Sequence, residues 1–85
     1  LELITTINAN YDERSKMLTV LFYGNYGEVV VSVEDEQGNT VHWDFIYVTM
    51  RSEISVPLKS ISAGRYKLSI TVVGESPMEG WFEAD

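Results

Sequence analysis

The chain contains no cysteine, two prolines and a single histidine among its 85 residues. Without cysteine there is no disulfide, no thiol nucleophile and no thiolate ligand for zinc or an iron–sulfur cluster. The longest uncharged run, Met17 to Gly27, is far shorter than the roughly 20 apolar residues of a membrane-spanning helix. No signal peptide is visible either, but a leader can be removed, so its absence decides nothing. These absences exclude thiol chemistry and predict no membrane insertion.

Basic residues are also scarce: six lysines and arginines stand against 13 acids, giving a formal net charge of -7. A negative field repels nucleic-acid phosphates and anionic lipids, and the basic residues form no run that would override it. We therefore expect no nucleic-acid partner. The apolar fraction of 45% is that of an ordinary folded protein, and the length predicts one domain over residues 1–85 without a deep cleft between lobes.

The chain does contain a clear alternation of apolar and polar residues with a period of two, which is typical of β-strands. Turn residues interrupt it at intervals of about 10 to 12 residues, as in a β-sandwich. The pattern predicts an all-β, immunoglobulin-like antiparallel β-sandwich of about seven strands. These strands are expected over residues 3–11, 16–23, 28–34, 40–47, 52–58, 65–73 and 78–84.

Two residues refine this prediction. Pro57 cannot donate a hydrogen bond to a neighbouring strand, so its strand should lie at a sheet edge or Pro57 should face outward at the strand end. Gly38 is expected to supply the positive φ that closes a short hairpin with a bulge.

The alternation also predicts which side chains form the core. Tyr66 falls on the inferred core face of its strand and should be buried. The other side chains expected to be nearly fully buried are Leu18, Val20, Phe22, Val29, Val31, Val33, Ile54, Val56, Leu68, Ile70 and Phe82.

The residues suited to chemistry do not form a convincing catalytic set. His42 and Asp44 lie two apart on one strand face, but no nucleophile elbow accompanies them, so we interpret His42 as a surface histidine. The acids Glu34 to Glu36, with Asn39 and Asp44, lack the ligand spacing of a calcium loop and fit a solvated hairpin tip. We therefore predict no enzyme activity, no catalytic residue, no metal site and no cofactor.

For several aromatic residues, the sequence does not decide between a place in the core and a place on a binding surface. Trp43, Phe45 and Tyr47 share one strand face and form either part of the core or an exposed platform for a sugar or peptide. Trp81 alternates with Phe82 and should point away from the core, where an indole suits protein or sugar contact. Trp81, with Tyr23 and Tyr26 as secondary candidates, is the predicted interface.

The segment from Leu58 to Ile70 contains Ala63-Gly64-Arg65-Tyr66 and looks like the E–F corner of immunoglobulin-like and fibronectin-like domains. This resemblance implies a tyrosine corner, in which the Tyr66 hydroxyl bonds to a backbone group between Leu58 and Gly64. With Leu18 to Phe22, the Gly38-Asn39 hairpin and Gly80 to Glu83, the chain resembles a family of small immunoglobulin-like proteins of unknown function exported by Bacteroidetes, many of them gut commensals. The resemblance implies export to the periplasm or cell surface and assigns no catalytic residue. A weaker resemblance is to the C-terminal sorting domains of type IX secretion cargo, but those usually end in a basic, apolar strand, unlike Glu83-Ala84-Asp85.

The function expected from these observations is that of an exported, non-enzymatic module that binds a protein or a glycan at the cell surface. Pairing of an edge strand with its symmetry mate would instead make the chain a homodimer. The alternative of a different class is a structural or sorting module of a larger secreted protein. The sequence does not identify the ligand.

Overall fold

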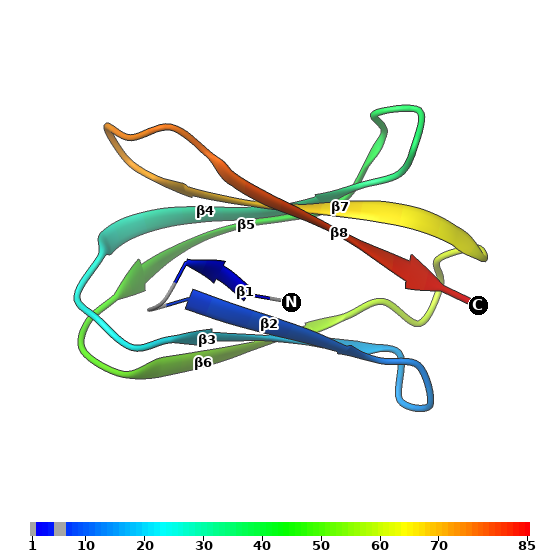
Figure 1. The fold of residues 1–85 in the computed structure, drawn as a ribbon, viewed down its shortest axis with the longest axis horizontal. Coiled ribbons are helices and arrows are strands. Elements are labelled where there is room, and N and C mark those ends of the chain that lie inside the picture. Colours follow the sequence, from blue (N-terminus) through cyan, green and yellow to red (C-terminus); the bar gives the residue numbers. More distant parts are fainter. Residues whose placement is uncertain (1, 5–6) are drawn as a thin grey trace.

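Alternating apolar side chains give each strand one face to bury, and two sheets bury these faces against each other in the computed structural model (Figure 1). The structure describes residues 2–4 and 7–85. One sheet has the order β1 (Glu2–Ile4), β2 (Ile7–Asp12), β3 (Met17–Phe22) and β6 (Ser52–Pro57). The other has the order β5 (Thr40–Val48), β4 (Gly27–Glu34), β7 (Gly64–Val72) and β8 (Met78–Ala84).

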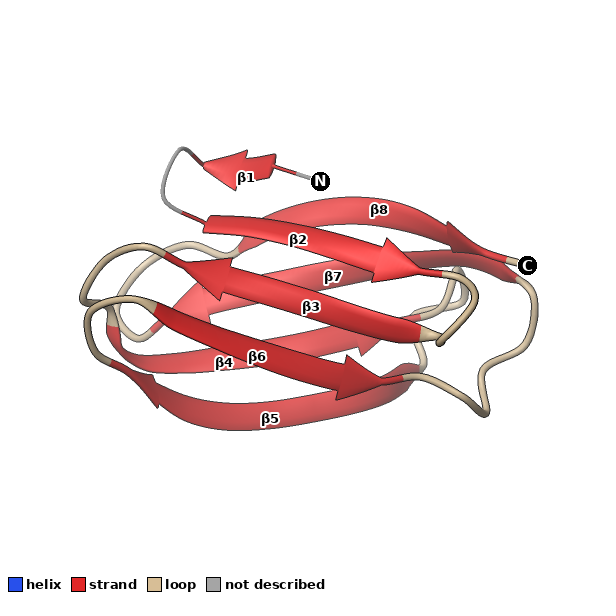
Figure 2. Ribbon diagram, turned by 90° about the horizontal axis from the view of Figure 1, so that it is seen from below, coloured by secondary structure: helices blue, strands red, loops and turns tan. Residues whose placement is uncertain are grey.

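The predicted immunoglobulin-like sandwich is confirmed, and six of the seven expected strands match β3 to β8 to within one residue at each end. All the described strand pairs are antiparallel. The first expected strand is wrong in part, because β1 and β2 form an antiparallel pair in which Glu2 lies opposite Asn8 (Figure 2). The sequence there reads Ile4-Thr5-Thr6-Ile7 and has no glycine, proline or asparagine to signal a turn.

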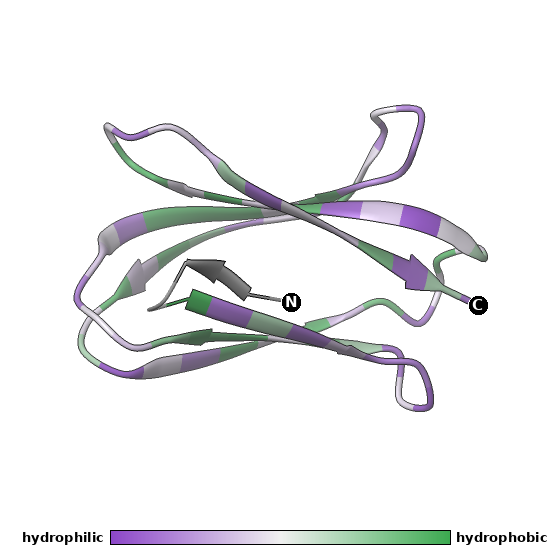
Figure 3. Ribbon diagram, viewed as in Figure 1, coloured by the Kyte–Doolittle hydropathy of each residue, from purple (hydrophilic) through white to green (hydrophobic). Residues whose placement is uncertain are grey.

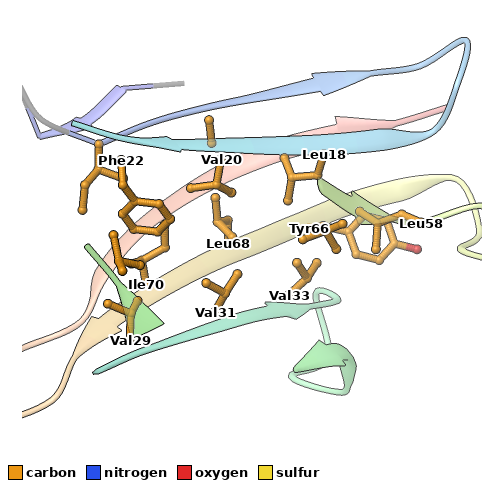
Figure 4. Close-up of a cluster of buried hydrophobic side chains, with 14 of the residues drawn as sticks. Leu18, Val20, Phe22, Val29, Val31, Val33, Leu58, Tyr66, Leu68 and Ile70 are labelled. Carbon is orange, nitrogen blue, oxygen red and sulfur yellow. The ribbon is translucent and has the colours of Figure 1, made fainter. Parts of the chain in front are cut away.

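The core lies between the sheets and is built from the predicted alternation (Figure 4). Of the eleven side chains expected to be nearly fully buried, all are so except Ile54 and Phe82, which are half-buried and pack against the core. Both belong to edge strands, β6 and β8, where a neighbouring strand covers one side only. The predicted register is therefore correct for β3, β4, β6, β7 and β8, since a slip of one residue would have exposed whole strand faces. The core also includes Ile7, Ala9, Val48, Leu58, Val72 and Ala84.

Pro57 and Gly38 lie where their backbone chemistry predicts. Pro57 is the last residue of the edge strand β6 and is exposed. Gly38 has a φ of 85° in the turn between β4 and β5, and the register of this pair shifts between Val33 and Glu34. Within the described ranges, no helix has the length and hydropathy needed to cross a membrane.

Candidate binding face

The register between β4 and β5 decides which side chains of β5 face solvent. On β4, Val29, Val31 and Val33 are fully buried, so their face points into the core. Their partners on β5 must share that face, and they are Ile46, Asp44 and His42. Alternate residues of β5 therefore lie on the outer face of the sheet, beside Glu28, Val30 and Ser32 of β4; they are Val41, Trp43, Phe45 and Tyr47.

These four residues, called here the β5 row, form an exposed apolar strip along one sheet edge. The exposed fractions are 60% for Trp43, 48% for Phe45 and 71% for Tyr47, and Val41 is also exposed. The interpretation of the three aromatic residues as core is therefore wrong, and the alternative, an exposed platform, matches their placement. Figure 3 shows that apolar and polar residues are mixed along the β5 ribbon. Only the register with β4 shows which of them face the core and which face solvent.

A charged group lies on the same outer face, at the end of β4 that leads into the hairpin. The Lys67 ammonium on β7 lies 3.2 Å from a Glu79 carboxylate oxygen on β8 and 3.4 Å from one of Glu34 on β4. Hydrogen bonding to Glu79, and then to Glu34, raises the pKa of Lys67 above its ordinary value. This ion triplet separates the β5 row from the aromatic residue at the other edge of the sheet.

That residue is Trp81 on β8, which is 43% exposed and points outward as predicted. Its cross-strand partner is Lys67, and the Arg65 guanidinium carbon lies 4.5 Å from the indole centroid. Cations over an aromatic face are attracted by its quadrupole, so Arg65 covers part of the ring that a ligand would otherwise contact. The predicted interface role of Trp81 stays a prediction.

The two tyrosines predicted to accompany Trp81 lie elsewhere. Tyr23 is exposed after the end of β3, in the other sheet, and the Arg51 guanidinium carbon lies 5.3 Å from its ring centroid. Tyr26 is half-buried against the core and makes an edge contact with Phe22 at 6.0 Å between centroids. The three predicted interface residues thus do not form one surface.

His42 is not the surface histidine that we predicted. It lies on the inner face of β5, is half-buried, and its Nε2 is buried with no hydrogen-bond partner among the described residues. The adjacent inner-face residue, Asp44, is exposed. A histidine acting as a general base would bond to a nucleophile, and no described residue makes a hydrogen bond to Nε2.

The acidic segment forms a hairpin tip, where the Asp35 carboxylate accepts hydrogen bonds from the backbone N–H groups of Gln37 and Asn39 and from the Asn39 side chain. The bond from the Asn39 backbone is the main reason why the pKa of Asp35 lies below its ordinary value of 3.8. Among the residues that the structure describes, no group of three or more acids or histidines is placed to hold a metal ion. The Asp35 carboxylate therefore stabilises the turn through these hydrogen bonds.

A shallow polar cavity of about 260 Å³ lies between this hairpin tip and the loop before β7. Its wall includes Tyr66, whose ring is buried and whose hydroxyl donates a 2.6 Å hydrogen bond to the Ser62 carbonyl oxygen. This geometry confirms the predicted tyrosine corner. The cavity lies where the tyrosine corner meets the hairpin tip, and its lining residues do not form a convergent set of catalytic groups.

The outer face of the opposite sheet provides a comparison. The described side chains there come from β2, β3 and β6. The polar ones are Asn8, Asn10, Asp12, Thr19, Glu53 and Ser55, and the apolar ones are Met17, Leu21 and Pro57, of which only Pro57 is exposed. Among the described side chains, this face has no aromatic residue, unlike the face with the β5 row. The face with the β5 row is therefore taken as the candidate binding face.

Comparison with known proteins gives a family match over nearly the whole chain. Residues 3–84 match the model of a domain of unknown function, DUF3244. The chain belongs to the DUF3244 family. A crystal structure of a DUF3244 family protein with an immunoglobulin-like β-sandwich fold, from Bacteroides vulgatus ATCC 8482, superposes with a TM-score of 0.82. It is 21% identical in sequence, and the match covers 94% of this chain and 84% of that one.

The match confirms both the resemblance to this family of small immunoglobulin-like proteins and the fold. No curated protein matches the chain. The family description indicates no enzyme class, so a role for this DUF3244 domain has to be argued from its own surface.

Proposed function

We propose that this DUF3244 domain is a non-enzymatic binding module that engages a protein partner through the outer face of β5. The observation that supports this most strongly is the exposure of Trp43, Phe45 and Tyr47 in one row. Aromatic residues are enriched at the centres of protein interfaces, and contiguous apolar strips are uncommon on the surface of monomeric proteins. The row is also built on a strand, which holds its side chains more rigidly than a loop would.

A protein fits this surface better than a glycan. Phe45 and Val41 have no polar group, and the neighbour of Phe45 on β4 is Val30, so the middle of the strip offers no hydrogen bond to a sugar hydroxyl. An apolar centre with a polar rim is the usual anatomy of a protein interface. Here the rim includes Glu28 and the Glu34–Lys67–Glu79 triplet.

The experiment compares three forms of the domain: the wild type, the triple variant Trp43→Thr/Phe45→Thr/Tyr47→Thr, and the control Leu21→Thr on the opposite sheet face. Threonine keeps the strand propensity while removing apolar area. Each form is immobilised and exposed to surface proteins of the producing cells and to a glycan array. The proposal predicts a protein that binds the wild type and the control but not the triple variant. Equal binding to the triple variant, or selective binding of a glycan alone, would contradict it.

We also propose that the domain works outside the cytoplasm, in the periplasm or at the cell surface. This is supported by the family resemblance, which implies export, and by the origin of the solved relative in Bacteroides vulgatus. Protease treatment of intact producing cells, followed by fractionation, tests this. Recovery of the domain only from the cytoplasmic fraction would contradict it.

A further inference from the structure

The β5 row lies on a strand whose other long side has no partner. β5 is the edge of its sheet, pairs with β4 alone among the described strands, and is nine residues long. The exposed edge of such a strand presents unpaired backbone N–H and C=O groups that can template another strand. Natural edge strands are usually short, or protected by charged side chains, proline or a bulge. β5 has no lysine, arginine or proline, its register shift lies at the hairpin end, and its one charged residue is Asp44 on the inner face.

We propose that the partner supplies an extended segment that adds to β5 as a fifth strand of this sheet, with apolar residues at alternate positions and basic residues between them. This rests on the proposed binding function and specifies the part of the partner that is bound. In such strand addition, main-chain hydrogen bonds provide affinity and alternate side chains provide specificity.

The apolar positions follow from the pleat. Every second side chain of the added strand would lie on the outer face next to the β5 row, at the separation of ordinary cross-strand pairs. Because alternate side chains along any strand repeat at about 6.6–6.8 Å, an extended peptide matches the spacing of Trp43, Phe45 and Tyr47 without adjustment. Aromatic and β-branched side chains would pair best with these rings.

The basic positions follow from charge. The remaining side chains of the added strand would lie on the inner side, next to His42, Asp44 and Ile46. Asp44 is exposed there with no cation beside it among the described ion pairs, and the whole domain has a net charge of -7. A lysine or arginine in the partner would meet Asp44 directly.

The same residue disfavours a second copy of this chain as the occupant. Asp44 is the central residue of β5 (Thr40–Val48), so two copies pairing antiparallel about their midpoints would place Asp44 opposite Asp44. Like charges directly opposite each other destabilise a strand pair, and each copy also brings its own net charge of -7. Centred pairing of two copies is therefore disfavoured, whereas a cationic strand would be attracted to Asp44.

The test uses a nine-residue peptide, the length of β5, with both ends chemically capped. In its sequence, lysine or arginine alternates with valine or phenylalanine. Two control peptides have the same residues in scrambled order, or the same order with N-methylation at every second residue. Binding is measured by titration calorimetry, and the protection of β5 amides by hydrogen exchange. We expect binding at least about tenfold tighter than for either control, because both controls disrupt the strand ladder. We also expect new amide protection confined to β5.

Protein variants then locate the site. Asp44→Lys should weaken binding of the basic peptide at least about fivefold, and Phe45→Thr should weaken it similarly. The matched change Trp81→Thr on the other edge of the sheet should leave binding unchanged. Circular dichroism confirms that each variant is folded.

Three results would overturn the inference. They are no binding of the alternating peptide, binding that ignores N-methylation, and a peptide-free dimer with β5 amides protected. The second result would leave the proposed binding function standing, because side chains alone would then make the contact. Loss of binding in Trp81→Thr but not in Phe45→Thr would move the binding site to β8 and overturn the role of β5.

Discussion

At the scale of single residues, the buried Tyr66 and the half-buried Tyr11 of this DUF3244 domain differ in how their hydroxyl groups are satisfied. The Tyr66 hydroxyl bonds to the Ser62 carbonyl, whereas the Tyr11 hydroxyl is buried without a hydrogen-bond partner in the described part of the chain. Both rings pack against Phe82, at centroid distances of 5.9 Å and 5.0 Å. Phe82 thus packs against one tyrosine whose hydroxyl is paired and one whose hydroxyl is not.

Replacing each tyrosine by phenylalanine should separate these situations. Tyr66→Phe should lower the free energy of unfolding by about 1–3 kcal/mol, because the Ser62 carbonyl loses its partner. Tyr11→Phe removes an unpaired buried hydroxyl, so it should be neutral or slightly stabilising. Urea denaturation of both variants measures the difference. If both variants lose the same free energy of unfolding, the hydrogen bond from Tyr66 to Ser62 does not stabilise the fold as we predict.

The environment of the Tyr11 hydroxyl also changes its pKa. Burial, followed by the charge of Glu13, raises the pKa of Tyr11 above its ordinary value of 10.0. A raised pKa in an acid means that the folded state favours the neutral form. Deprotonation in strongly alkaline solution should therefore be harder in the folded domain than in the unfolded chain.

At the scale of elements, the sequence was informative about strands and less so about their faces. Alternation predicted β3 to β8 because turn residues separate them clearly, and the core side chains followed from the same pattern. The pairing of β1 with β2 could not be predicted, because Ile4 to Ile7 contains no turn residue. Local chemistry therefore identifies a strand more readily than it identifies a division between two strands when no turn residue marks it.

β5 shows why its faces could not be assigned from its own residues. One face has Trp43, Phe45 and Tyr47 and the other has His42 and Asp44, so the pattern alone favours burial of the aromatic residues. The pairing with Val29, Val31 and Val33 of β4 reverses this assignment and turns the aromatic side outward. A strand whose more apolar face is exposed conflicts with the local pattern, and such conflicts are expected at functional sites.

The hairpin between β4 and β5 gives a prediction that depends on pH. Because the folded state lowers the pKa of Asp35, its ionised form stabilises the fold above the pKa of the unfolded chain, and this contribution is lost as the pH falls through the folded pKa. The stability advantage of the wild type over Asp35→Asn should therefore be constant above about pH 5 and shrink below about pH 4. Thermal unfolding of both proteins across this range measures it. An advantage that does not change with pH would contradict the role of the charge.

At the scale of the whole molecule, the two sheets share one apolar core but have different outer faces. The face formed by β2, β3 and β6 is mostly polar, whereas the opposite face has the β5 row at one edge and Trp81 at the other. The core is complete without the β5 row, since the buried cluster takes only Val48, and in part Ile46, from β5. The aromatic residues are thus an addition to the fold, which is the central claim of this account.

Equilibrium unfolding in urea tests this claim most directly, with Trp43→Thr/Phe45→Thr/Tyr47→Thr compared with Phe22→Ala. Phe22 is fully buried, so its replacement should lower the free energy of unfolding by about 3–5 kcal/mol. The account predicts that the triple variant changes this free energy by no more than about 1.5 kcal/mol, because its side chains are exposed. A loss in the triple variant as large as that in Phe22→Ala would mean that the aromatic residues stabilise the fold, contradicting their assignment to a partner.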